Sequence, residues 1–516
     1  MIGRGGGTEG SVHVGFALKE GWEKESSIAA FGARRRPIMI LGCTSDAGKS
    51  FLTAALCRWL ARRGERVFPF KAQNMSNNAA VCPGGGEIGR AQWLQAKAAR
   101  LEPEARMNPI LLKPEAETRS QVVVLGRHDP ELSRTPWLER GPRLWPVVSS
   151  ILDAVTVEYD RVVAEGAGSP AEPNLMRHDL VNFAVARHIG AACYIVADID
   201  RGGAFAHLLG TYETIDIPDR RLVRGFILNK FRGDPALLLD AREWLEERTG
   251  LPTVALVPFR RSILPEEDSF FHRPSGATGR IKIALTLYPY ASNLDDFDPL
   301  AGEDGIDLVP VREVADIEGA SAIVLPGSKS TVSSLDYLRK TGLAGRISRA
   351  AREGIPIFGV CGGLQMLGDE IRDPLGVEGV GARGLGLLDV VTTLAPEKTV
   401  RLRDAECEDG SRVHGYEIHQ GETNIMAGPA RADEAGTPTG VVAHLSDGLG
   451  WRSANVTGVY LHGIFANTAY RQRFLSSLGW RGETMDWNAR LESDLDAIAD
   501  LVDESGWAVD LARLSP

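Results

Sequence analysis

The chain has 516 residues, of which 43% are hydrophobic and 24% charged, a composition typical of soluble globular proteins. Its formal net charge of −10 disfavours a broad role in binding nucleic acid or a membrane surface, so we expect neither among its partners. No apolar run approaches the roughly 18 residues of a membrane span, and the start lacks the apolar core of a signal peptide. Six scattered cysteines, without metal-type or disulfide-type spacing, favour a cytoplasmic location.

Residues 1–36 are rich in glycine at their start, end in three arginines and show no periodicity. We predict that they form a disordered extension. Regular structure is predicted to begin with a short buried strand over Pro37–Gly42, and a helical pattern follows that ends at Gly64.

Between this strand and helix lies the glycine-rich segment Gly42-Cys-Thr-Ser-Asp-Ala-Gly-Lys-Ser50. A strand, a glycine-rich loop and a helix in this order are the context of a phosphate-binding loop. We expect Ser45 and Gly48 to lie around the phosphates of ATP and Lys49 to reach the terminal ones. The hydroxyl of Ser50 is expected to ligate Mg²⁺.

The next segment, Lys71–Asn78, is unusually rich in amides, and the candidates for ligand contacts in it are Lys71, Gln73, Asn74 and Asn77. Similar polar stretches follow at residues 84–95, 107–114 and 120–124. Any one of them could be an ordinary polar loop. Together they predict a binding wall for an anionic ligand with many hydrogen-bonding groups.

A predicted strand over residues 160–165 ends in Glu165. A carboxylate at a strand end near a phosphate loop commonly takes Mg²⁺, directly or through water, although surface capping is the alternative. Asp179 could be a helix N-cap or an active-site acid, and the sequence does not separate the two. Further strands at residues 191–198 and 222–229 alternate with helices, which predicts a doubly wound, mostly parallel sheet with ligands at the carboxyl ends of its strands.

Residues 271–280 have the composition of a linker, and a second series of strands and helices begins at Ile281. The sequence therefore predicts an ATP-dependent domain over residues 37–270, a second α/β domain over 281–475 and a helical tail over 476–516. The second domain opens with an acidic stretch at residues 292–299, for which the sequence suggests no role.

The second domain is organised around Cys361, which follows the apolar run Ile355–Val360 and precedes a helical pattern. Three glycines, at 359, 362 and 363, would let the backbone turn sharply there, and a helix N-terminus favours the thiolate. This arrangement predicts a nucleophile elbow. A buried structural cysteine is the alternative, but it would not need three glycines around it.

A cysteine nucleophile needs a base and donors for the oxyanion. Two histidines compete for the role of base: His462, in a strand-like apolar segment followed by Gly463, and His419, in the motif Gly-Tyr-Glu-Ile-His. A histidine in a strand is often only packed there, so position alone does not separate them.

The stretch Gly359–Gly368 resembles the nucleophile loop of class I glutamine amidotransferases, and Tyr460–Phe465 is similar to the base segment of their corrin-type members. The resemblance implies that Cys361 is the nucleophile and His462 the base. It implies that the backbone N–H groups of Gly362 and of the turn at Gly327 hold the oxyanion. Most class I members carry a glutamate two residues after the histidine, but Ile464 stands there in this chain, so no third residue is identified.

The phosphate loop, with five residues between its glycines, resembles the loops of dethiobiotin synthetase and the corrin-type amidotransferases. The MinD/ParA-type ATPases carry a signature lysine where Thr44 stands here, which disfavours a partitioning ATPase. Several long motifs occur in the order found in the cobyric acid synthase family, at residues 71–78, 86–92, 107–114, 165–172 and 197–203.

This resemblance implies an α/β protein of two domains, a phosphate-loop domain with a doubly wound sheet and a glutamine amidotransferase domain. It implies a ligase of cobalamin biosynthesis that uses ATP, Mg²⁺ and glutamine, without a tightly bound cofactor. The substrate would be a corrinoid polycarboxylate, adenosylcobyrinic acid a,c-diamide, amidated through acyl phosphates at its b, d, e and g side chains. The alternatives are the sister enzyme that amidates the a and c carboxylates, a partitioning-type ATPase, and a corrinoid-binding protein without turnover. No oligomeric state is predicted.

Overall fold

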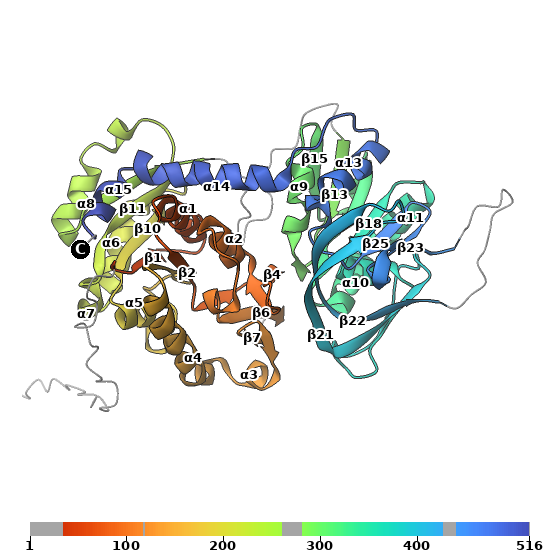
Figure 1. Cartoon of the computed structure of the whole chain (residues 1–516), viewed down its shortest axis with the longest axis horizontal. Helices are drawn as coiled ribbons and strands as arrows, with labels where there is room; N and C mark the ends of the chain where they lie inside the picture. Colours follow the sequence, from red (N-terminus) through yellow and green to blue (C-terminus); the bar gives the residue numbers. More distant parts are fainter. Residues whose placement is uncertain (1–34, 117–118, 261–280, 427–439, 515–516) are drawn as a thin grey trace, which may run out of the picture. The chain divides into compact units, whose positions relative to one another are not determined.

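The computed structural model describes residues 35–116, 119–260, 281–426 and 440–514 (Figure 1). The predicted linker and residues 1–34 of the predicted extension lie outside these ranges. Within them, every helix is too short or too polar to cross a lipid bilayer.

The first α/β domain is built on a six-stranded sheet in which all neighbouring strands are parallel. Its order is β12 (Thr253–Pro258), β11 (Val223–Phe231), β10 (Ala192–Asp198), β1 (Ile38–Gly42), β9 (Arg161–Glu165) and β2 (Val67–Phe70). The predicted parallel sheet of this domain is therefore confirmed.

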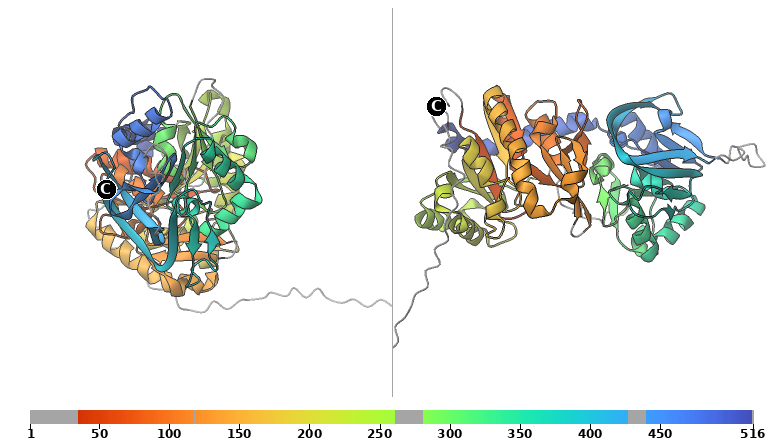
Figure 2. Two further views of the ribbon diagram at one scale, coloured as in Figure 1. Left: turned by 90° about the vertical axis from the view of Figure 1, so that its right-hand side faces the viewer. Right: turned by 90° about the horizontal axis from the view of Figure 1, so that it is seen from below.

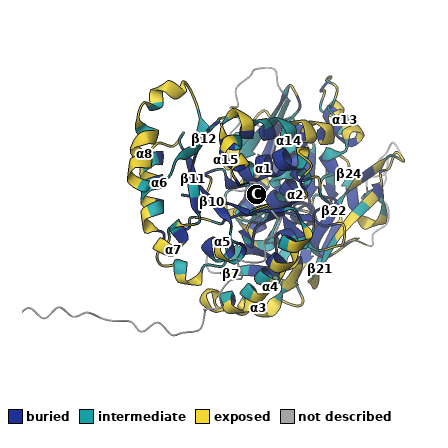
Figure 3. Ribbon diagram, turned by 60° about the vertical axis from the view of Figure 1, so that its left-hand side comes forward, coloured by how far each residue is buried: buried dark blue, intermediate teal, exposed yellow. Residues whose placement is uncertain are grey.

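Helices cover both faces of this sheet. On β1, Ile38 and Ile40 pack with α1 (Lys49–Arg62), whereas Met39 and Leu41 pack into the core on the opposite face. The helices of that second face are α4 (Trp137–Glu158), α5 (Phe183–Ile189) and α6 (Ala204–Thr214). Because successive side chains of a strand point to opposite faces, a strand covered on both sides is apolar throughout. Figure 3 shows these central strands buried, with exposed residues gathered on outer helices such as α8 (Ala241–Thr249).

The C-terminal helices α14 (Trp487–Glu504) and α15 (Trp507–Ala512) follow the second domain in sequence but pack on the first (Figure 1). Arg58 on α1 places its Nε 2.9 Å from an Asp496 carboxylate oxygen. Trp507 is fully buried in the core that contains Ile38 and Ile40. The predicted helical tail thus contributes core residues to the first domain.

The second domain contains a seven-stranded sheet whose last two strands are antiparallel to their neighbours. Its order is β15 (Ile306–Val311), β13 (Ile281–Thr286), β16 (Ala322–Leu325), β18 (Ile357–Val360), β25 (Val456–Val459), β24 (Gly450–Ser453) and β23 (Val442–Leu445). The helices α10 (Thr331–Lys340), α11 (Leu343–Arg352) and α12 (Gly362–Leu367) pack with it in one core.

A long antiparallel hairpin of β21 (Val390–Glu406) and β22 (Arg412–Ile425) is added to this domain (Figure 2). Strand β22 carries the Gly-Tyr-Glu-Ile-His motif. An isolated bridge between Tyr416 and His462 joins the hairpin to the segment after β25. The hairpin therefore brings the two candidate histidines into one region.

Much of the polar sequence between residues 71 and 129 forms short strands. One small sheet has the order β3 (Gln73–Met75), β6 (Ile110–Ala116), β7 (Arg119–Val124) and β8 (Arg127–Asp129). A ribbon of β4 (Ala79–Val81) and β5 (Glu87–Gly89) precedes α2 (Arg90–Ala98). The amide-rich segments are thus partly held in regular structure: Gln73 and Asn74 lie in a strand, whereas Asn77 and Asn78 lie between strands.

Candidate active sites

The phosphate-type loop lies where the sequence predicts it, between the end of β1 and the start of α1. Gly48 has a φ of 95°, and a Cβ atom there would stand 2.0 Å from Nδ2 of Asn229. That amide donates a hydrogen bond to the carbonyl of Ala47 over 2.9 Å. Position 48 therefore requires glycine, both for its backbone conformation and for the close approach of Asn229.

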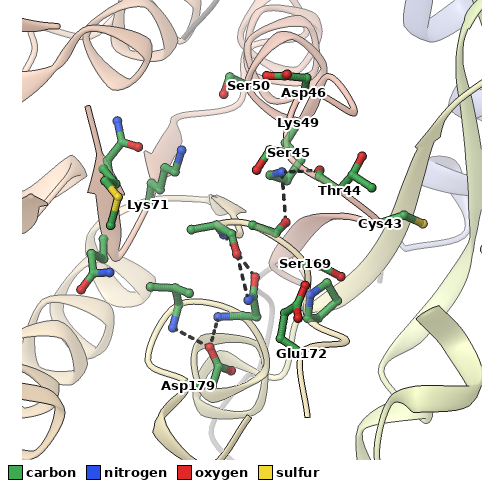
Figure 4. A pocket seen from close by; sticks show the side chains of 18 of the residues that line it. Cys43, Thr44, Ser45, Asp46, Lys49, Ser50, Lys71, Ser169, Glu172 and Asp179 are labelled. Atoms are coloured by element: carbon green, nitrogen blue, oxygen red, sulfur yellow. Dashed lines mark hydrogen bonds between the residues drawn. The ribbon is translucent and has the colours of Figure 1, made fainter. Parts of the chain in front are cut away.

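The loop borders a cavity of about 880 Å³. Its walls include most of the residues predicted to bind ATP or substrate, namely Ser45, Gly48, Lys49, Ser50, Lys71, Gln73, Asn74 and Asp179. Figure 4 shows Ser45 and Lys49 on the opposite side of this cavity from Glu172 and Asp179. The ammonium of Lys49 donates to the carbonyls of Thr44, at 3.1 Å, and Gly168, at 3.2 Å.

Glu165 ends β9, as predicted, and lies buried behind Ser50. One carboxylate oxygen accepts a hydrogen bond from the Ser50 hydroxyl over 2.8 Å and lies 2.9 Å from the ammonium of Lys71. The other accepts from the amide of Gln95 over 2.5 Å. A hydroxyl and a carboxylate side by side are hard oxygen donors of the kind that Mg²⁺ prefers, so this pair fits the predicted metal.

Two predicted ligand-contact residues, Asp179 and Asn77, lie at different cavities. Asp179 lines the large cavity, and its carboxylate accepts hydrogen bonds from the backbone N–H groups of Val181, Asn182 and Ala184 over 2.8–3.0 Å. It therefore binds free N–H groups at the start of α5 while standing at the cavity wall. Asn77 does not line the cavity beside the phosphate loop; it lines a second, smaller cavity beside Cys361.

The rest of the large cavity combines apolar and cationic side chains. Met75, Trp137 and Leu175 line it and remain exposed over 52%, 44% and 44% of their surface. Cationic residues also contribute to the wall, namely Arg177, Arg187, Lys230 and Arg260. Large exposed apolar side chains gathered around a cavity are typical of a ligand-binding surface.

Cys361 stands between the end of β18 and the start of α12, with a φ of 52° and a ψ of −109°. Such backbone is strained for a residue with a side chain, and strain of this kind is concentrated at functional sites. A Cβ atom on Gly363 would stand 2.2 Å from the carbonyl of Leu325, and one on Gly362 would stand 2.8 Å from the backbone N of Ser328. The glycines therefore let the elbow sit directly against the end of β16, as a nucleophile elbow requires.

The same contact brings together the two segments predicted to hold the oxyanion. Gly362 lies beside the turn at Gly327 and Ser328, and it is Ser328 that lines the cavity next to Cys361. A Cβ atom on Gly327 would lie 3.4 Å from Cε1 of His462. The predicted base and the predicted oxyanion turn thus lie next to each other.

His462 lies three residues beyond the end of β25, so the strand predicted around it stops earlier. Its Nδ1 is 2.7 Å from Oδ2 of Asp296, whose Oδ1 accepts the backbone N–H of Gly463 over 2.8 Å. Burial lowers the pKa of His462, but the charge and hydrogen bond of Asp296, together with a hydrogen bond to Cys361, raise it to about 10. Because Nδ1 faces the carboxylate, Nε2 is the atom left for the cysteine.

His419 has different partners, although it also lines the cavity of Cys361. Its Nδ1 lies 3.1 Å from the carbonyl of Gly421, its Nε2 lies 3.3 Å from Glu417, and its ring stacks on Tyr460. Both ring nitrogens of His419 are engaged, so the geometry favours His462 as the base.

The cavity beside Cys361 is small, about 40 Å³, and combines residues of both domains. Asn77 and Lys113 come from the first domain; from the second come Lys329 and Lys398, two cations that the sequence did not suggest. The pKa of Lys398 is lowered to about 8 by burial and by Lys113, against the raising effect of Glu87. Both lysines are paired with carboxylates: the ammonium of Lys398 lies 2.6 Å from Glu87, and that of Lys329 lies 2.9 Å from Glu115.

Asp296 is the main site residue that the sequence analysis missed. The class I pattern places a third member two residues after the histidine, where Ile464 stands here, whereas Asp296 precedes His462 by 166 residues. The acidic stretch at residues 292–299 was the only signal, and nothing in its spacing links it to a histidine so far along the chain.

Comparison with known proteins agrees with this architecture. Residues 38–269 match the CobQ/CobB/MinD/ParA nucleotide binding domain, and residues 282–470 match the CobB/CobQ-like glutamine amidotransferase domain. The cobyric acid synthase of Deinococcus radiodurans is 53% identical over 85% of this chain and 92% of its own length. The cobyric acid synthase of Variovorax paradoxus is 49% identical over 91% of this chain and 97% of its own. The chain belongs to the cobyric acid synthase family.

Proposed function

We propose that this protein is a glutamine-hydrolysing adenosylcobyric acid synthase of cobalamin biosynthesis. It would amidate the b, d, e and g carboxylates of adenosylcobyrinic acid a,c-diamide with ammonia released from glutamine. The observation that carries the proposal is the Cys361 elbow with His462 held by Asp296, in one chain with a phosphate loop backed by Glu165. A nitrogen source and a site for activating carboxylates are what such a ligase needs.

In the glutaminase half, the Cys361 thiolate attacks the side-chain amide carbon of glutamine. The N–H groups near Gly362 and Gly327 hold the developing oxyanion. His462 gives a proton to the leaving nitrogen, the C–N bond breaks and ammonia departs, leaving a thioester. His462 then takes a proton from water, which cleaves the thioester to glutamate and restores the cysteine. Asp296 holds the imidazole in the orientation that these transfers require.

In the synthetase half, the phosphate loop binds ATP, with Lys49 placed to stabilise charge on the transferred phosphoryl group. Ser50 and Glu165 would hold Mg²⁺, which neutralises phosphate charge when bound. A substrate carboxylate takes the γ-phosphoryl group and releases ADP. Ammonia then attacks the acyl phosphate, and phosphate leaves as the amide forms.

The walls of the large cavity support a corrinoid as the acceptor. Its volume of about 880 Å³ lies toward the upper end of the usual range for ligand pockets. Met75, Trp137 and Leu175 offer apolar surface to a macrocycle. Arg177 suits its carboxylates, because guanidinium groups bind them through paired hydrogen bonds.

The test is mass spectrometry of the corrinoid after incubation of the protein with adenosylcobyrinic acid a,c-diamide, ATP, Mg²⁺ and glutamine. We expect four successive replacements of a carboxyl OH by NH₂, with ADP and glutamate as co-products. A matched incubation with the fully unamidated corrinoid shows whether the a and c positions are also substrates. An unchanged corrinoid mass in the first incubation would contradict the proposal.

A further inference from the structure

The segment that carries Asp296 is fixed by contacts from the first domain. Asn293, which is buried and precedes the short helix η5 (Leu294–Phe297), donates its backbone N–H to the side chain of Asn78 over 2.8 Å. Its side-chain amide donates to the carbonyl of Ala79 over 2.7 Å and to the hydroxyl of Tyr416 over 2.9 Å. The start of this acidic segment is therefore tied to the ribbon that precedes α2.

Arg90, the first residue of α2, reaches the neighbour of Asp296. Its Nε lies 2.7 Å from Oδ2 of Asp295, and the two side chains are only 20% and 8% exposed. The guanidinium carbon of Arg90 also lies 4.1 Å from the centre of the Trp93 ring, and its backbone N–H donates to the carbonyl of Asn78. Arg90 and Asn293 are thus both hydrogen-bonded to Asn78 of the first domain.

The two adjacent carboxylates, Asp295 and Asp296, have separate cationic partners: Arg90 for the first and His462 for the second. Burial raises the pKa of Asp295, the positive charge of Arg90 opposes this, and the negative charge of Asp296 adds to it. Without Arg90, a buried carboxylate would stand beside Asp296 with no cation of its own. It would then either take up a proton or compete with Asp296 for His462.

We propose that Arg90 is a positioning residue of the glutaminase site, acting through Asp295. Its ion pair with Asp295 fixes the segment that carries Asp296. Asp296 then remains bonded to Nδ1 of His462 without competition from Asp295. The inference rests on the proposed glutaminase role of Cys361 and His462. On this proposal the amidotransferase domain needs Arg90, a residue of the ATP-dependent domain, to neutralise the carboxylate of Asp295.

The test compares four variants of the full chain with the wild type. Arg90→Met removes the charge and keeps much of the side-chain volume, and Arg90→Lys keeps the charge. The double variant Arg90→Met/Asp295→Asn removes both members of the pair. Arg66→Met is the matched control, because Arg66 forms a pair of similar length, 3.0 Å, with Asp160 on an exposed surface of the same domain.

We expect Arg90→Met to lower kcat for glutamine hydrolysis by about tenfold or more, with a much smaller change in KM, because the altered group does not touch glutamine. Arg90→Lys should restore part of the rate, and the double variant should restore most of it, since no carboxylate is then left unpaired. Amidation driven by ammonium chloride should stay at the wild-type level in all variants, as should both activities of Arg66→Met.

Three results would overturn the inference. The first is that Arg90→Met hydrolyses glutamine at the wild-type rate. The second is that the double variant hydrolyses glutamine no faster than Arg90→Met, and the third is that Arg90→Met loses glutamine-driven and ammonium-driven amidation equally. The second would show that Arg90 matters only for packing between domains. If the wild type itself fails to hydrolyse glutamine, the proposed function is wrong, and that failure is distinguishable because it does not depend on Arg90.

Discussion

Asp296 Oδ2 lies 2.7 Å from Nδ1 of His462, and both side chains are almost completely buried. The contact joins the start of the amidotransferase domain to the segment after its β25 strand, and it places a carboxylate beside the histidine for which the sequence pattern lacks an orienting acid. Since the same carboxylate also accepts the N–H of Gly463, it is fixed by two bonds to the chain around the histidine.

Changing Asp296 to Asn should lower kcat for glutamine hydrolysis by roughly 10³–10⁴-fold, because an amide can hold the wrong tautomer of the histidine. Since Asp296 contributes most to raising the pKa of His462 to about 10, the alkaline limb of kcat/KM should also move to lower pH. A pH profile of glutamate release measures both effects. Asp336→Asn, at an exposed position of α10, is the control. An unshifted alkaline limb would show that Asp296 does not set the charge of His462.

Lys49→Ala should abolish amide formation with glutamine and with ammonium chloride alike, because phosphoryl transfer depends on positioned positive charge. Glutamine hydrolysis should persist, since Cys361 lies at a different cavity. ADP release and amide yield are the measurements, with Lys97→Ala as a partly exposed control on α2. Near wild-type amide yield from ammonium would mean that this loop does not bind the reacting ATP.

Glu165→Gln should have two effects, because Glu165 is also the partner of the buried Lys71. Synthetase activity should fall strongly, with a higher Mg²⁺ requirement. The free energy of unfolding should fall by about 3–5 kcal/mol, since a buried ion pair is broken.

Ser50→Ala separates these effects, because it removes the hydroxyl and keeps the ion pair. It should raise the Mg²⁺ requirement with little change in the denaturant midpoint. Normal turnover in Glu165→Gln, together with lower stability, would assign Glu165 a purely structural role.

The parts of the site that could be predicted from sequence are those encoded locally. The phosphate loop and the Cys361 elbow each consist of a strand, a glycine-bearing turn and a helix within about 25 residues, and local pattern specifies such units. Spacing does not encode contacts between distant segments, so these could be predicted only where the family resemblance implied them, as for His462 and Gly327 beside Cys361. The sequence did not indicate three such contacts. Asp296 bonds to His462, the β21–β22 hairpin brings His419 to the cavity of Cys361, and Asn77 lines that cavity rather than the one at the phosphate loop.

The C-terminal helices give a further prediction about stability. Trp507 is fully buried in the first domain's core and packs edge-on against Tyr194, with ring centres 5.4 Å apart. Trp507→Ala should lower the free energy of unfolding by about 3–5 kcal/mol. Trp244→Ala, at a partly exposed site, should cost about 1 kcal/mol or less. Equal denaturation midpoints for the two variants would show that the C-terminal helices do not stabilise the first domain.

We propose that one chain holds a glutaminase site at Cys361 and a separate synthetase site at the phosphate loop. The most direct test is the amide yield of Cys361→Ser with glutamine and, in parallel, with a high concentration of ammonium chloride. A serine hydroxyl is a far weaker nucleophile than a thiolate, so glutamine-driven amidation should nearly vanish, whereas free ammonia should still reach the acyl phosphate. If a folded Cys361→Ser protein loses both activities equally, Cys361 is not a dedicated glutaminase nucleophile and the two-site account is contradicted.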